Sequence, residues 1–298
     1  MDVLHRDTKP FVQRFVNTFV SGPFAQVAFS VGSVVVGIVA GFGRFTTFTL
    51  TTFRWMVTRP SCWTSWRQLG PQLFRVGVAS VPVVAIVGLF IGMILALEGY
   101  AQFAAIGQED RMGGLINAAV TKQIGPVLAA VMLAGRVGGA LAAELGSMKV
   151  TEQLDAMRVM AADPIRTLVV PRVVACVVMT PLLTIYSDLL GSFGAWFISV
   201  KVNGISGPDY WHFTALFVTW WEPTTGIIKS VVFGLSIGLI SCYKGFHCGA
   251  GATGVGRAAT ASFVASFLAI IVANLVLAQF LGQLQAWVDP TSQINLLS

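Results

Sequence analysis

Residues 76–97 read VGVASVPVVAIVGLFIGMILAL, an apolar run without a single charged side chain. A helix needs roughly 20 such residues to cross a hydrocarbon core about 30 Å thick. Backbone groups inside lipid must find hydrogen-bond partners within their own segment, and this run is too long for a barrel strand. The stretch therefore predicts a membrane-spanning α-helix.

Four further apolar runs follow along the chain. They cover residues 113–133, 165–185 with a continuation toward 200, 227–242, and 258–281. Of the 298 residues, 55% are hydrophobic and 11% are charged, whereas an ordinary soluble domain has about 25% charged residues. The sequence predicts an all-α integral membrane protein with five transmembrane helices in one membrane domain, residues 73–298.

Residues 1–72 form a second region with a less regular pattern. Phenylalanines alternate with polar residues over 11–24, which is typical of a helix lying in the membrane interface. Residues 27–57 are long enough to span, but glycines loosen the run and Arg44 interrupts it. The sequence leaves open whether this segment spans or re-enters. Residues 1–10 are charged and have no apolar core, so no cleaved signal peptide is expected.

Basic side chains gather in alternate loops between the predicted spans. Residues 54–75, 143–172 and 244–257 hold most of the arginines and lysines, whereas residues 98–111 and 201–222 are mainly acidic. The positive-inside rule places the basic loops in the cytoplasm and the C-terminus outside. This bias explains the formal charge of +6 better than nucleic-acid binding, which would need a basic patch on a water-exposed face.

Several motifs that carry chemistry in other proteins are absent or incomplete. The four cysteines form no C-x-x-C pair, so free thiols are expected. His247 beside Cys248 gives two ligands, too few for a metal site. No G-x-x-x-x-G-K-[ST] motif occurs, so this chain is not the ATPase. Residues 249–254 match G-x-G-x-x-G but follow no strand, which indicates a flexible cytoplasmic loop.

The polar segment at residues 143–167 separates the second and third runs. One helical face is shared by Val150, Leu154, Met157 and Ala161. Residues 143–172 balance four basic residues with four acidic ones, whereas a linker helix resting on lipid would be mainly basic. A docking surface for another protein is therefore favoured over a linker. Asp163 and Pro164 then predict an N-cap that starts the next helix.

Residues 135–157, GRVGGALAAELGSMKVTEQLDAM, with DPIR at 163–166 and VPR at 170–172, closely resemble the MlaE family of ABC transporter permeases. Further matches are FIGMILALEGY at 90–100, QIGPV at 123–127, IKSVVFG at 228–234 and GVGRAAT at 254–260. The matches cover about residues 73–266, and the central stretch is the most specific. Where the family often has an acidic residue before Leu-Gly-Pro, this chain has Gln123.

The resemblance implies an architecture and a set of partners. It implies a membrane-embedded elbow helix before the five spans, a homodimer in the bacterial inner membrane, and a cytoplasmic ATPase that binds the ATP, so that this chain is not itself an enzyme and needs no cofactor. It also implies a periplasmic partner with an Mce domain and a lipid substrate, most commonly phospholipid. A coupling helix over residues 144–161 would press on the ATPase. Its expected contact residues are Glu144, Thr151, Glu152, Gln153, Asp155 and Arg158.

Four polar residues in the first two clean spans are candidates for the lipid cavity. Lys122 and Gln123 fall near mid-depth, and Glu98 and Tyr100 near the outer end of the preceding helix. Polar groups at such depth cost several kcal/mol, about 3, unless they face a cavity or a partner. The alternative is that Lys122 snorkels to the interface and Gln123 bonds a neighbouring helix. Asp188 is expected at the outer interface, in contact with water.

Two other classes of function compete with a lipid permease. An ion-coupled secondary carrier would use buried acids and broken helices near the midplane, and few buried acids are evident. A membrane-embedded enzyme would need convergent nucleophile, base or metal groups. None of the three histidines falls inside a predicted span, and no catalytic residue is expected.

Overall fold

The computed structural model describes residues 23–58 and 66–288, and helices account for nearly all of them. Contacts divide the chain into two units, Met1–Thr51 and Thr52–Ser298. The expected interfacial helix at 11–24 and Cys62 lie largely or wholly outside the described residues. The expected domain boundary between residues 72 and 73 falls inside helix α4 (Trp66–Val76) and stays a prediction.

Helix α2 (Pro23–Thr58) carries the described part of the first unit and crosses into the second. Its stretch Val35–Thr58 is long and apolar enough to cross a membrane. Length and composition thus permit a span, and the choice between spanning and re-entry stays open.

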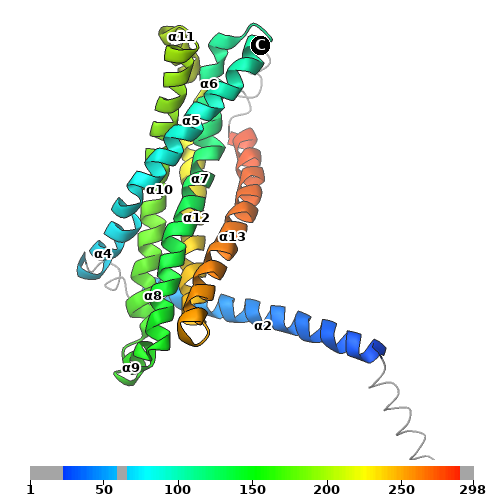
Figure 1. Cartoon of the computed structure of the whole chain (residues 1–298), viewed down its shortest axis with the longest axis vertical. Coiled ribbons are helices and arrows are strands. Elements are labelled where there is room, and N and C mark those ends of the chain that lie inside the picture. Colours follow the sequence, from blue (N-terminus) through cyan, green and yellow to red (C-terminus); the bar gives the residue numbers. More distant parts are fainter. Residues whose placement is uncertain (1–22, 59–65, 289–298) are drawn as a thin grey trace, which may run out of the picture. The chain divides into compact units, whose positions relative to one another are not determined.

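Five long helical segments build the second unit, which confirms the predicted all-α membrane fold (Figure 1). The first consists of α4, η1 (Val78–Ser80) and α5 (Val81–Ala104). After η2 (Glu109–Arg111), the second consists of α6 (Met112–Ala119), η3 (Val120–Ile124), α7 (Gly125–Leu133), η4 (Ala134–Gly138) and α8 (Gly139–Val150). The short α9 (Gln153–Val159) leads to the third, which consists of η5 (Ile165–Val169), α10 (Val170–Trp196) and η6 (Phe197–Val202). Helix α11 (Gly207–Phe217) precedes the fourth and fifth, α12 (Trp221–Phe246) and α13 (Gly251–Val288).

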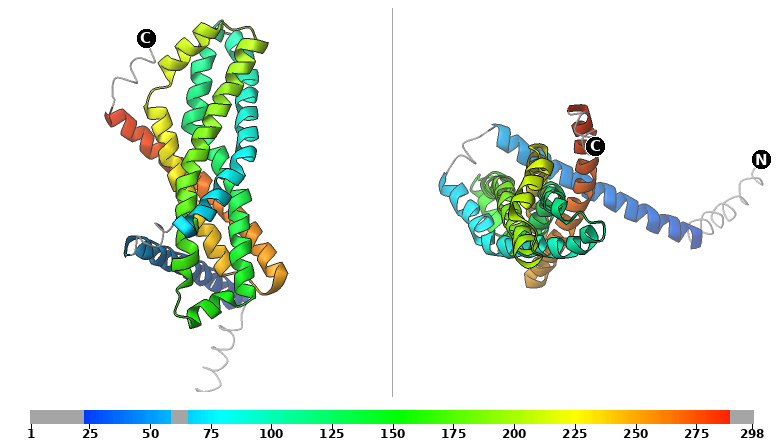
Figure 2. Two further views of the ribbon diagram at one scale, coloured as in Figure 1. Left: turned by 90° about the vertical axis from the view of Figure 1, so that its left-hand side faces the viewer. Right: turned by 90° about the horizontal axis from the view of Figure 1, so that it is seen from above.

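Helix α10 lies at the centre of this unit and packs closely on α5 and α12, within the bundle seen from above in Figure 2. Gly92 of α5 faces Gly191 of α10 so closely that a Cβ on Gly92 would overlap the Gly191 carbonyl. On the other side, a Cβ on Gly234 of α12 would lie 2.6 Å from the Cys176 carbonyl. Small residues let membrane helices approach at this distance.

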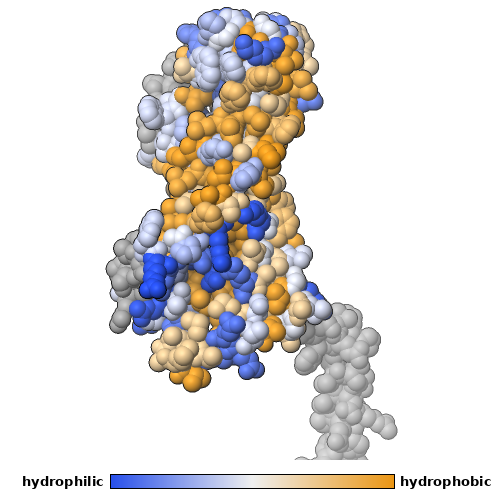
Figure 3. Space-filling model, turned by 60° about the vertical axis from the view of Figure 1, so that its left-hand side comes forward, coloured by the Kyte–Doolittle hydropathy of each residue, from blue (hydrophilic) through white to orange (hydrophobic). Residues whose placement is uncertain are grey.

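The connections of the second unit gather at two opposite ends. Figure 1 shows α9 and the α12–α13 turn at one end, and the α5–α6 connection with α11 at the other. Lys149 at the end of α8 donates a hydrogen bond to the Cys248 carbonyl, at 2.9 Å, so the α8 terminus and the α12–α13 turn meet. Two of the three loops predicted to be basic, 143–172 and 244–257, therefore share one end. On the face in Figure 3, hydrophobic side chains predominate between hydrophilic areas toward both ends.

Two local predictions are confirmed. The Asp163 carboxylate accepts a hydrogen bond from the Ile165 backbone N–H at 2.9 Å, as an N-cap does. Cys176, Cys242 and Cys248 are free and buried.

Replacing Gly92 with alanine tests the α5–α10 contact. The added methyl would meet the Gly191 carbonyl, so we expect the free energy of unfolding to fall by about 1–3 kcal/mol. Thermal unfolding of the detergent-solubilised chain is the measurement. Gly282→Ala is the matched control, because a Cβ there meets nothing within 4 Å; equal melting temperatures for both variants would argue against the contact.

Candidate functional site

The second span is interrupted by a π-helical turn, η3, and Pro126 explains where it falls. Proline has no backbone N–H, so the Lys122 carbonyl four residues earlier loses its α-helical partner. Just before the proline, the Gly125 N–H donates to the Val120 carbonyl, five residues back, where a regular α-helix would use the carbonyl four residues back. Such π turns occur frequently at functional sites.

Lys229 of α12 supplies the donor that Pro126 lacks. Its Nζ lies 3.2 Å from the Lys122 carbonyl oxygen and also donates to Oε1 of Gln123. The Lys229 residue is fully buried. Gly226, one turn earlier, permits this approach, because a Cβ there would lie 2.5 Å from the Thr121 carbonyl. These hydrogen bonds offset part of the cost of burying an ammonium group.

The Lys122 side chain leaves the π turn in another direction. Its Nζ donates to Oε1 of Gln285 on α13 at 3.1 Å and lies 4.0 Å from Oε1 of Glu222. The Lys122 side chain is 39% exposed, whereas that of Glu222 is 10% exposed. We call Lys122, Gln123, Glu222, Lys229 and Gln285 the polar cluster. It holds two ammonium groups and one carboxylate, so positive charge is in excess.

The four expected cavity residues fall in two places. Lys122 and Gln123 belong to the polar cluster. Tyr100 packs instead among the apolar side chains of α5, α6 and η6, and Glu98 is exposed. Among the described residues, neither has a hydrogen bond or ion pair to the cluster. The two places differ because Lys122 bonds to Gln285 of α13, whereas Tyr100 packs among apolar side chains that include Ile116 of α6.

Sequence reasoning missed the buried members of the cluster. Lys229 interrupts an otherwise apolar run, and that position alone was a usable signal, because a charge at such depth is costly without a function or a partner. The sequence pattern places Glu222 in an acidic loop, whereas the structure buries it near Lys122. The expectation for Asp188 is wrong: its Oδ1 is buried, has no hydrogen-bond partner among the described residues, and occupies the space where Gly125 would carry a Cβ.

The expected coupling segment is not one helix. Helix α8 continues to Val150, and Glu152 then takes a left-handed conformation with φ of 59°, which redirects the chain into the seven-residue α9. Of the predicted apolar face, only Leu154 is buried. The expected contact residues that are exposed at this end are Thr151, Glu152, Gln153, Asp155 and Arg158.

Glu144, the remaining expected contact residue, lies between two arginines. Its Oε1 is 2.6 Å from Arg75 of α4, and its Oε2 is 3.1 Å from Arg172 of α10. Arg172 is buried and also donates to the Leu168 carbonyl at 3.0 Å. Glu144 therefore joins three segments at the end that carries α9.

At the opposite end, α11 is held to α6 by buried polar groups. The Asn117 amide donates to Oη of Tyr210 and to Oγ1 of Thr214, each at 3.0 Å. Gly113 leaves room for the Tyr210 ring. Burial raises the pKa of Tyr210 to about 12, although the Asn117 bond acts in the opposite direction.

The chain is similar to known permeases over most of its length. A family model described as "Permease MlaE" matches residues 69–280. A "Probable ABC transporter permease protein" of Rickettsia bellii is 35% identical over 254 residues, 85% of this chain and 97% of the relative. The protein TRIGALACTOSYLDIACYLGLYCEROL 1, chloroplastic, of Arabidopsis thaliana is 36% identical over 73% of this chain and 62% of the relative. The "Intermembrane phospholipid transport system permease protein MlaE" of Haemophilus influenzae is 33% identical over 69% of this chain and 79% of the relative.

Lys229→Met tests whether the lysine completes the π turn. The change leaves the Lys122 carbonyl and the Gln123 amide oxygen without their donor, so the free energy of unfolding should fall by about 1–3 kcal/mol. Thermal unfolding followed by tryptophan fluorescence measures it. Lys201→Met, at an exposed position near the end that carries α11, should change the free energy of unfolding much less; the opposite order would refute this assignment.

Proposed function

The chain belongs to the MlaE permease family, and we propose that it is the membrane subunit of an ATP-driven ABC transporter that moves phospholipid between the inner membrane and an Mce-domain partner. The polar cluster is the observation that carries the proposal. A phospholipid has an anionic phosphate and two apolar tails, so its site needs a few cationic donors within apolar walls. Lys122 and Lys229 are such donors, and apolar span helices surround them.

Within the cluster, the two lysines have different roles in this proposal. Lys122 is partly exposed and bonded only to side chains, so a phosphate oxygen can replace Gln285 as its partner without breaking backbone contacts. Lys229 is fully buried and bonded to the backbone, so it holds the π turn in place and adds positive potential. Gln123 accepts from Lys229 and keeps its ammonium oriented.

The ATP is hydrolysed by a separate ABC ATPase in this proposal. The chain has no P-loop sequence, and its exposed, charge-balanced segment around α9 suits a protein partner. A second copy of the chain would complete the permease as a homodimer. The end that carries α9 would face the cytoplasm, and the end with α11 would face the Mce-domain protein, which fits the distribution of basic loops.

One observation favours an ion-coupled secondary carrier instead. In the part of the chain that the structure describes, Asp188 has a buried carboxylate oxygen without a hydrogen-bond partner, and carriers use such acids for coupling. An ATPase that co-purifies in equal number with the chain would decide for the ABC transporter. Lipid movement by the chain alone, driven by an ion gradient, would decide for the carrier.

Reversing charge on α9 tests the docking of the ATPase. Glu152→Lys with Asp155→Lys replaces two exposed carboxylates, so like charge and lost partners should weaken the complex, on the order of tenfold. Recovery of the co-expressed ABC ATPase with the purified permease is the measurement. Glu109→Lys, at the other end, is the control, and undiminished recovery with the double variant would count against docking at α9.

A photo-crosslinking residue at Gln285 tests the lipid site. Gln285 touches Lys122, so this position should capture phospholipid retained through detergent purification. The same residue at Ile271, exposed on the same helix, should capture much less. Equal capture at both positions would show that annular lipid explains the signal, and the headgroup assignment would have to be withdrawn.

A further inference from the structure

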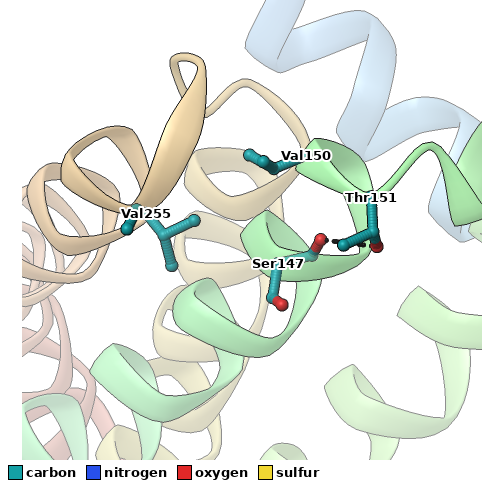
Figure 4. A pocket seen from close by; sticks show the side chains of 5 residues that line it. Ser147, Val150, Thr151 and Val255 are labelled. Carbon is teal, nitrogen blue, oxygen red and sulfur yellow. Dashed lines mark hydrogen bonds between the residues drawn. The ribbon is translucent and has the colours of Figure 1, made fainter.

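A surface groove lies beside α9, and it includes residues of α13 that are not part of the expected coupling segment. A groove with a volume of about 280 Å³ separates the end of α8 from the start of α13 (Figure 4). We call it the end groove. It is lined by Ser147, Val150, Thr151, Ala252 and Val255. Three of these side chains are apolar. The Thr151 hydroxyl already bonds to the Ser147 carbonyl at 2.9 Å.

The walls of the end groove are fixed to each other. The Lys149 ammonium donates to the Cys248 carbonyl at 2.9 Å, and the Cys248 thiol lies 3.4 Å from the Gly146 carbonyl. Gly254 packs directly on the Gly249 carbonyl, where a Cβ would collide. The glycine-rich turn between α12 and α13 is therefore folded against α8, and the groove exists before any partner binds.

The position of the groove argues against membrane lipid as its occupant. The second span, Glu109–Val150, has 42 residues, or about 63 Å of helix at 1.5 Å per residue, twice the thickness of the hydrocarbon core. Glu144, with its two arginine partners, marks a charged layer near its end. Ser147 and Val150 come one and almost two turns beyond that layer, which by this count lies at or beyond the edge of the hydrocarbon core.

We propose that the end groove receives an apolar side chain of the ABC ATPase and forms a second anchor beside α9. The inference rests on the proposed function and extends it. Two observations select this occupant: Thr151 belongs both to the groove and to the turn that leads into α9, and Val159 and Met160, at the end of α9, are 89% and 71% exposed. Hydrophobic atoms also reach the lower tip in Figure 3.

This second anchor changes how the ATPase moves the permease. Contact at α9 acts on α8 and α10, which flank it in the chain. Contact in the end groove acts on α13 directly and on α12 through the folded turn. A movement of the ATPase would then displace all four helices that carry or flank the polar cluster, and not only the pair joined by α9.

Filling the groove tests the proposal. Ala252 is exposed in the first turn of α13, so Ala252→Trp can occupy the groove without entering the core. Recovery of the co-expressed ABC ATPase with the permease should fall about tenfold, as expected for loss of a central apolar anchor. Ala252→Ser leaves the groove open and should retain wild-type recovery. Equal recovery with both variants would overturn the proposal.

Cysteine alkylation tests the same contact without the tryptophan variant, whose loss of ATPase binding could also come from misfolding. With Cys62 replaced by serine, the remaining native thiols are buried, and Ala252→Cys offers one accessible thiol. Bound ATPase should slow alkylation of this thiol about tenfold. Alkylation of a cysteine introduced by Asp209→Cys, at the other end, should keep its rate. Unchanged alkylation would overturn the proposal, and so would protection without ATPase, which would assign the groove to a second copy. If wild-type permease binds no ATPase, the proposed function itself fails.

Discussion

The contact of the Lys229 ammonium with the Lys122 carbonyl is the interaction on which the rest of the membrane domain depends. Pro126 removes the backbone donor that this carbonyl would have in a regular helix, and hydrocarbon offers no water to replace it. A buried lysine from another helix fills the position. Helix α12 is thereby fixed against the π turn, and the Lys122 side chain is turned toward α13.

A rigid connection links this centre to the end that carries α9. Glycine contacts hold α5 to α10 and α10 to α12 without intervening side chains. Glu144 joins α4, α8 and α10 through two ion pairs. Packed cores of this kind shift as bodies and do not deform continuously. Force applied at α9 or at the end groove would therefore reach the polar cluster as a movement of whole helices.

The sequence was sufficient for the spans, because hydrophobicity and length are what the bilayer selects. It predicted the helix start at Asp163. It also singled out Lys122 and Gln123 as lipid-cavity residues, which stays a prediction. It did not predict the break at Glu152, because a left-handed residue other than glycine carries no clear sequence mark. Lys229 was missed because the groups that it bonds lie on a distant helix. Asp188 was misplaced because its packing against Gly125 is invisible along the chain. The expected coupling helix is divided between the end of α8 and α9, because the chain turns at Glu152.

The central claim is that the polar cluster binds the headgroup of a phospholipid. An experimental density map of the permease with its ATPase, in a phospholipid bilayer and without nucleotide, tests this most directly. The account predicts a phosphate within hydrogen-bond distance of Lys122 Nζ, with Lys229 still bonded to the Lys122 carbonyl. An ordered lipid whose phosphate lies elsewhere in the membrane domain, with Lys122 still bonded to Gln285, would contradict it.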